Sequence, residues 1–217
     1  MIDKKFIAGI IVFGSLWGFA ECIIGSFLRD ADLPAGALMT GIFAIGLMTL
    51  SRVSFRKPGM QTGIGLVAGS LRFFNPFFGG CFICSAIAIM VEGFLFDLIW
   101  TGLALDSKKT LSLTIQASLG ITTSYLVYVG GYITTQILTP LLSSAGFYVE
   151  NLIVFLPQIL ASGLLVALIG SVCIPTVFRI KQLNIALQER LFYPVTIGIS
   201  VLCWFIVIGN TLLIMWL

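Results

Sequence analysis

Seven long apolar segments, separated by short polar breaks, account for most of the chain. They cover residues 6–28, 34–51, 59–75, 78–105, 111–139, 152–178 and 191–217. A helix needs about 20 apolar residues to cross a hydrocarbon layer of about 30 Å. The pattern therefore predicts a single integral membrane domain, an all-α bundle of six or seven transmembrane helices.

The third segment decides between six and seven crossings. It is short, ends at Asn75-Pro76 and is followed by Gly79-Gly80. Irregular backbone at membrane depth must be buried in protein or face water. We therefore expect this segment either to enter the membrane only part way or to pack against its neighbours as a tilted hairpin.

The amino-acid composition of the chain is also typical of a protein embedded in lipid. Of the 217 residues, 59% are hydrophobic and 10% are charged, whereas soluble domains carry about 25% charged residues. The first segment is too long for a cleaved signal peptide and carries Glu21, so we expect it to stay as the first helix.

The basic residues divide unequally between the two ends of the predicted helices. Cytoplasmic loops of membrane proteins are enriched in Lys and Arg. Only Arg29 and Arg72 fall near one side, which predicts a cytoplasmic N-terminus in the plasma membrane. The net charge of +3 then reflects topology, and we expect no nucleic-acid partner. The ten residues on the cytoplasmic side are Lys4, Lys5, Arg52, Arg56, Lys57, Lys108, Lys109, Arg179, Lys181 and Arg190.

Small residues form a stripe along the first predicted helix. Gly14 and Gly18 are four residues apart, and Cys22 and Ser26 continue the spacing. Small residues let helix backbones approach closely within a membrane. The stripe therefore favours either packing within the chain or docking of a partner subunit, and sequence alone does not separate the two.

Charged side chains inside the predicted membrane segments are the main functional candidates. Each costs about 2.5–3.5 kcal/mol at a helix centre, so each needs a partner, water or a change of protonation. At 1.5 Å per residue, Glu21 and Arg72 reach depths that permit an ion pair. Glu92 falls near the midplane, and Asp97 is rotated away from it.

Other polar residues fall in the same outer half of the bundle. Tyr125, Tyr128 and Tyr132 share one helix face, and this clustering predicts an outward-opening pocket for a small molecule. The alternative is that the charges form structural ion pairs and the tyrosines are ordinary core. The predicted substrate-binding residues are Trp17, Glu21, Arg72, Asn75, Glu92, Tyr128, Tyr132 and Gln158.

The chain has no His, and it lacks the common nucleotide and hydrolase motifs. We therefore expect no catalytic residue, no metal and no cofactor. Cys81-x-x-Cys84 is the one motif with redox meaning, and its alternatives are packing, a disulfide or thiol function, and metal binding. Two alternative functions therefore remain, namely an external thiol oxidoreductase and a structural subunit of a membrane complex.

Several motifs of the first half occur in a similar order in one transporter family. They are the small-residue first helix, Leu33-Pro34-Ala35-Gly36-Ala37, Lys57-Pro58-Gly59, Gly65-x-x-x-Gly69 and Val91-Glu92-Gly93. In these the chain resembles the substrate-binding S components of energy-coupling factor (ECF) vitamin and micronutrient transporters.

The resemblance implies a bundle, typically of six helices, that binds a vitamin-like or micronutrient-like solute from outside. It also implies docking on a membrane coupling subunit driven by two ATPases. Gly14 and Gly18 would take the place of that family's Ala-x-x-x-Ala docking face. The glycines and the seventh segment at 191–217 depart from the family pattern.

Overall fold

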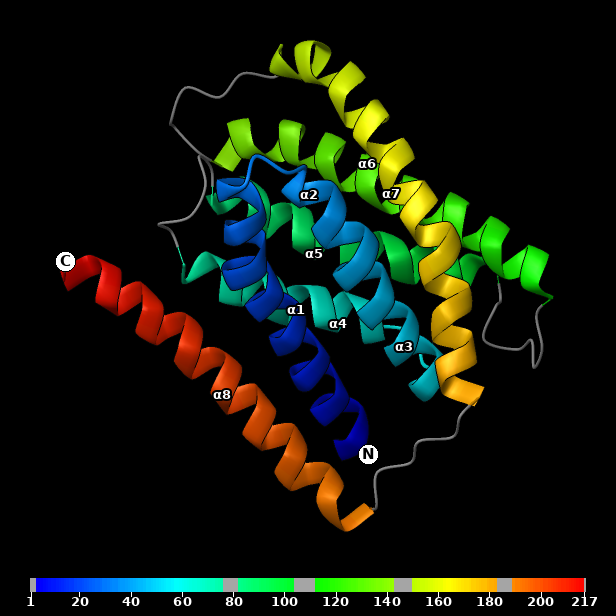
Figure 1. Ribbon diagram of the computed structural model, residues 1–217, viewed down its shortest axis with the longest axis vertical. Coiled ribbons are helices and arrows are strands. Elements are labelled where there is room, and N and C mark those ends of the chain that lie inside the picture. The colour runs from blue at the N-terminus through cyan, green and yellow to red at the C-terminus, as the bar shows by residue number, and fades with distance from the viewer. Residues whose placement is uncertain (1–2, 76–81, 104–111, 143–149, 183–188, 217) are drawn as a thin grey trace.

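The computed structural model describes residues 3–75, 82–103, 112–142, 150–182 and 189–216. Within these ranges all regular secondary structure is helical, which confirms the all-α prediction (Figure 1). The helices are α1 (Lys4–Asp30), α2 (Ala35–Leu38), the π-helix η1 (Met39–Ala44), α3 (Ile45–Phe55), α4 (Met60–Phe73), α5 (Phe82–Gly102), α6 (Leu113–Leu142), α7 (Asn151–Gln182) and α8 (Glu189–Trp216).

Each apolar segment corresponds to one helix, because α2, η1 and α3 follow one another directly and form a single helix of 21 residues. Five helices of the described chain are long and apolar enough to cross a membrane: Lys4–Asp30, Ala35–Phe55, Ile83–Gly102, Asn151–Lys181 and Leu191–Leu213. With 14 residues, α4 is only about 21 Å long. It is too short to cross alone.

The helices pack as a closed bundle with one outlier. Along the bundle, α1 packs against α4, α4 against α5, α5 against α6, and α6 against α7. The η1 and α3 part of the second helix lies against α7 and also contacts α1, which closes the arrangement (Figure 1). All these helices therefore enclose one common interior.

Glycines set the spacing between α4 and α5. A Cβ atom on Gly93 would lie 2.5 Å from the carbonyl oxygen of Gln61, and one on Gly65 would lie 3.1 Å from the Cα of Gly93. The two backbones touch here, as expected where small residues form a helix contact. A larger residue at Gly93 would force the helices apart.

Gly14 and Gly18 show the same packing between α1 and α4. A Cβ on Gly14 would lie 2.6 Å from the Cβ of Val67, and one on Gly18 would lie 2.9 Å from the Cβ of Leu71. Both glycines are buried against the chain itself, so the intramolecular alternative for this stripe is the one that the structure shows. A partner subunit cannot dock on these two residues while α4 covers them.

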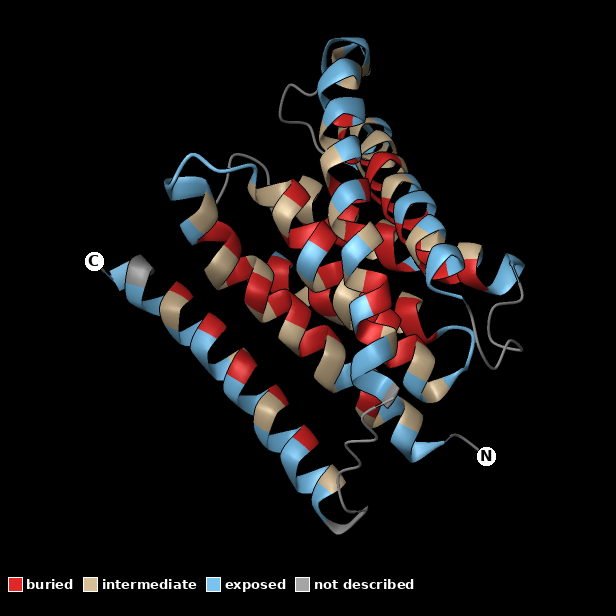
Figure 2. Ribbon diagram, turned by 45° about the vertical axis from the view of Figure 1, so that its right-hand side comes forward, coloured by how far each residue is buried: buried red, intermediate tan, exposed pale blue. Residues whose placement is uncertain are grey.

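Helix α8 lies outside the bundle. It packs along α1, where the indole nitrogen of Trp204 donates a hydrogen bond of 3.0 Å to the Ser15 hydroxyl. Figure 2 shows buried residues gathered in the bundle interior, whereas the helix that ends at the C-terminus is mostly exposed. Thus α1 has α4 on one side and α8 on another.

A tight turn joins α3 to α4 at the end where the chain begins. Arg56 ends α3 in the left-handed conformation, with φ of 50°, and Gly59 precedes α4 with φ of 85°. Only glycine adopts such a positive φ readily. Within the turn, the Lys57 ammonium bonds to Asp3, whose other carboxylate oxygen caps α1 at the amide of Lys5. This contact joins the N-terminus of α1 to the turn between α3 and α4.

Candidate functional site

A cavity of about 250 Å³ lies at the end of the bundle away from the N-terminus. Its walls come from the C-terminal halves of α1, α4 and α6 and from the N-terminal parts of the second helix and α5. The small residues Gly25 and Gly36 leave room for it. The polar and charged residues of its walls are Glu21, Arg29, Thr40, Arg72, Cys84, Ser85, Glu92, Tyr132, Thr135 and Gln136.

Glu21 enters the cavity from α1. Trp17 lies one helical turn earlier, is fully buried, and donates its indole N–H to the Glu21 carboxylate over 3.1 Å. The i to i+4 spacing on one helix brings the two side chains together. Trp17 therefore stands behind the cavity wall and orients Glu21, without lining the cavity itself.

Glu92 enters the cavity from the middle of α5 and is only 2% exposed. Its carboxylate accepts a hydrogen bond of 3.0 Å from the Thr40 hydroxyl. Thr40 belongs to η1, and π-helical turns within α-helices occur frequently at functional sites. The wider turn thus supplies the hydroxyl that holds Glu92, and its neighbour Met39 lines the same cavity.

Arg72 enters from the last turn of α4 and is 1% exposed. Its Nε donates to the Ser85 hydroxyl over 3.2 Å, and a terminal nitrogen donates to the Asn75 carbonyl over 2.9 Å. A cation near the last turn is also favoured by the helix dipole. Among the described residues, Glu21 and Arg72 share the cavity without the direct ion pair that their depths permit.

Two tyrosines of α6 lie beside these charges. Tyr132 lines the cavity, and its hydroxyl occupies the space beside Gly36, where an added Cβ would lie 2.1 Å away. Tyr128 lies behind it, with the two ring centroids 4.4 Å apart. The aromatic pair therefore forms one rigid wall, of which only Tyr132 reaches the cavity.

Four of the eight predicted residues thus line one cavity, namely Glu21, Arg72, Glu92 and Tyr132. Trp17, Asn75 and Tyr128 support those four from behind through the contacts given above. Gln158 does not belong to this group, because it lies on an exposed face of α7. The prediction for Gln158 used its position along the helix, which does not determine the side of the helix that the residue occupies.

The cavity also contains polar residues that the sequence analysis missed. Thr40 and Ser85 hold charged groups, while Arg29, Thr135 and Gln136 add to the walls. No single position among them stands out, because isolated Thr, Ser and Gln residues are common in membrane helices. The one usable signal was Thr135-Gln136, one turn beyond Tyr132 on the same helix.

The cysteine motif falls partly in this site. Cys84 lines the cavity and is disulfide-bonded, whereas Cys81 lies outside the described residues. Cys22, Cys173 and Cys203 have free thiols. In the part of the chain that the structure describes, no group of three or more Cys, Asp or Glu residues is placed to hold a metal ion.

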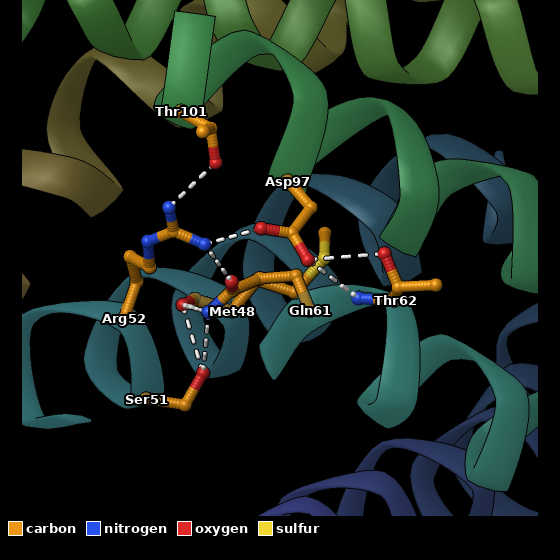
Figure 3. A network of polar contacts seen from close by, with 7 residues as sticks. All are labelled: Met48, Ser51, Arg52, Gln61, Thr62, Asp97 and Thr101. Atoms are coloured by element: carbon orange, nitrogen blue, oxygen red, sulfur yellow. Dashed lines mark hydrogen bonds and ion pairs between the residues drawn. The ribbon is translucent and has the colours of Figure 1, made fainter. Parts of the chain in front are cut away.

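A second polar cluster occupies the opposite end of the bundle (Figure 3). Arg52 was predicted to lie in a cytoplasmic loop, but α3 extends past it and the side chain is fully buried. Its guanidinium forms an ion pair with Asp97 and donates to Gln61 over 2.9 Å and to Thr101 over 2.8 Å. The loop assignment of Arg52 was therefore wrong.

The other atoms of this cluster are also satisfied. Asp97 accepts hydrogen bonds from the backbone and hydroxyl of Thr62, over 3.3 Å and 3.0 Å. The Gln61 amide donates to the Met48 carbonyl and the Ser51 hydroxyl. The cluster therefore joins α3, α4 and α5 through side chains that bond to one another. We interpret it as a structural clasp.

Comparison with known proteins adds no further evidence on the site. No protein-family model, no curated protein and no solved structure matches this chain.

Proposed function

We propose that this chain is an integral membrane protein that binds a small solute in the cavity between α1, α4, α5 and α6. Five helices have the length and apolarity to cross a bilayer. Large apolar side chains are widely exposed on α7 and α8, including Leu168 at 66%, Val172 at 67% and Phe205 at 76%. Water-soluble monomers rarely expose so much contiguous apolar surface, whereas lipid would cover it.

The observation that carries the solute-binding role is the cavity itself. Glu21, Arg72 and Glu92 converge on it from three helices. Intramembrane ionisable residues usually mark a functional site because they are costly to insert. Its volume lies just below the range of about 300–1,000 Å³ that is typical of drug-sized ligands, so the expected solute is small.

The proposed direction follows from the basic residues. With the N-terminus in the cytoplasm, the cavity lies toward the external side, and the clasp of Arg52 and Asp97 lies toward the cytoplasm. Uptake of an external solute fits this arrangement. The energy source would then be supplied by partners, namely a coupling subunit and ATPases of the ECF type, on a docking surface other than Gly14 and Gly18.

Thiol chemistry is the second candidate because disulfide-bonded Cys84 lies in the wall of the same cavity. A double Cys81→Ser, Cys84→Ser variant separates the two functions. A solute-binding protein keeps its ligand in this variant, whereas a thiol oxidoreductase loses all thiol exchange with an external dithiol substrate.

The test of the proposed function is native mass spectrometry of the protein purified in mild detergent with its membrane neighbours. We expect one small molecule bound per chain. A Gly25→Phe variant should lose it because residue 25 lines the cavity. The control is Gly25→Ala, since a Cβ there would lie 3.6 Å from Met39 and 3.7 Å from Glu21, which is ordinary contact.

Arg72→Ala should also lose the molecule while the protein remains folded, as judged by size-exclusion chromatography and circular dichroism. Retention of an equal amount of ligand by folded Gly25→Phe and Arg72→Ala would place binding elsewhere. An empty wild-type protein in every preparation, with no uptake of any solute by cells, would contradict solute binding altogether.

A further inference from the structure

The two carboxylates of the cavity are held by hydrogen bonds from neutral groups, whereas buried carboxylates are usually held by direct ion pairs. Glu92 is held by the neutral hydroxyl of Thr40, and Glu21 by the neutral indole of Trp17. Among the described residues neither forms an ion pair. A carboxylate with only neutral donors in a low-dielectric interior is costly unless a cation or a proton neutralises it.

The two arginines of the cavity act on Glu21 through space, but neither is a charge partner of Glu92. Arg72 is fixed in the wall by its hydrogen bonds to Ser85 and to the Asn75 carbonyl. Arg29 is exposed near the end of α1. The lining contains two acids and two arginines, but Glu92 has only the neutral Thr40 hydroxyl and the like charge of Glu21 beside it.

The surroundings of these carboxylates favour an organic cation over a metal ion. Divalent ions require more oxygen ligands, six to eight for Ca²⁺, and the described residues contain no metal-binding cluster. The Tyr132 ring lines the same cavity, and aromatic rings attract organic cations. An ammonium group could donate hydrogen bonds to both carboxylates.

We propose that the solute bound in this cavity carries a positively charged nitrogen, which Glu21 and Glu92 bind together. This inference rests on the proposed solute-binding function and specifies its substrate class. An uncharged or anionic solute of the same size would leave Glu92 to be neutralised by a proton alone.

The test uses three probes that share a butyl chain, namely butylammonium, butan-1-ol and butanoate. Equilibrium dialysis against the purified protein at low ionic strength measures the affinity of each. We expect butylammonium to bind most tightly. Glu92→Gln should weaken its binding by about 10- to 100-fold, as expected for loss of a charged hydrogen bond, and Glu21→Gln should act in the same direction.

Both substitutions keep the side-chain shape and an oxygen that can accept from Thr40 or Trp17, so the fold should survive. Glu150→Gln is the matched control, because Glu150 is exposed and lies outside the cavity walls. Binding of butan-1-ol should be weak and equal in all four proteins.

Three results would overturn the inference: equal or tighter binding of butanoate or butan-1-ol, unchanged butylammonium affinity in Glu92→Gln, or no butylammonium binding to the wild type. The co-purified solute gives an independent outcome. If it is neutral or anionic, the proposed function stands and this inference fails. If no solute co-purifies and no probe binds, both fail.

Discussion

Replacing Asp97 with Asn should destabilise the bundle by about 3–5 kcal/mol, the usual cost of leaving one member of a buried ion pair without its partner. The substitution preserves shape, so packing in α5 stays intact. The Arg52 guanidinium keeps its charge, is fully buried, and keeps its hydrogen bonds to the neutral oxygens of Gln61 and Thr101.

The geometry of the clasp explains why Asn cannot substitute. One carboxylate oxygen of Asp97 accepts from Arg52, and the other accepts from the amide and hydroxyl of Thr62. Asn has a single acceptor oxygen, so its NH₂ group must face a donor on one side. The variant therefore loses the negative charge of Asp97 together with one set of hydrogen bonds.

A double variant, Arg52→Met with Asp97→Leu, distinguishes the cost of an unpaired buried charge from the cost of altered side-chain packing. Apolar residues of similar volume often replace a buried pair at little cost. We therefore expect the double variant to be more stable than Asp97→Asn. The exposed pair of Asp3 and Lys57 is the matched surface control, and Asp3→Asn should change stability little because water screens that contact.

Stability can be measured by titrating SDS into the protein in mild detergent and following helix content by circular dichroism. A loss below about 1 kcal/mol for Asp97→Asn would refute the reasoning, since that is the range of a solvent-exposed pair. A double variant less stable than Asp97→Asn would also refute it.

Two further predictions concern packing and pH. Gly93→Ala should destabilise the fold by about 1–3 kcal/mol in the same titration, because its Cβ would meet the Gln61 carbonyl; Gly198→Ala, with no atom within 4 Å, should not. The hydrogen bond from Lys57 lowers the pKa of Asp3 below its usual 3.8. The contact therefore stabilises the protein at neutral pH and is lost as the pH falls through the lowered pKa. In acid titrations, Asp3→Asn should be less pH-sensitive below pH 3.8 than the wild type, and identical curves would contradict this.

The helix positions could be predicted from sequence because apolar runs and polar breaks alternate clearly. Six of the seven segments match a continuous α-helix to within a few residues, from α1 at Lys4–Asp30 to α8 at Glu189–Trp216. The π-helical turn within the second was not predictable, since Met39–Ala44 contains no residue that forbids ordinary α-helix. It lies where the second helix packs against α7 and α1.

The sequence predicts how far along its helix each candidate site residue lies, but not which face of the helix carries it. Counting residues along each helix places Glu21, Arg72 and Tyr132 in the outer half and Glu92 near the midplane, and all four line one cavity. The same count placed Gln158 there, but α7 is apolar on all sides and its sequence does not reveal which face turns inward. Long-range pairing was equally hidden, as with Arg52 and Asp97, which are 45 residues apart.

The cavity described above also has a consequence for the synthesis of the chain. Every described residue that lines it lies between Glu21 and Gln136, within the helices from α1 to α6. A ribosome therefore delivers all of these wall residues to the membrane before α7 and α8 emerge. A solute that binds this cavity, as proposed, would then meet the nascent protein and favour its correct assembly, so that ligand supply during growth would control how much mature protein accumulates.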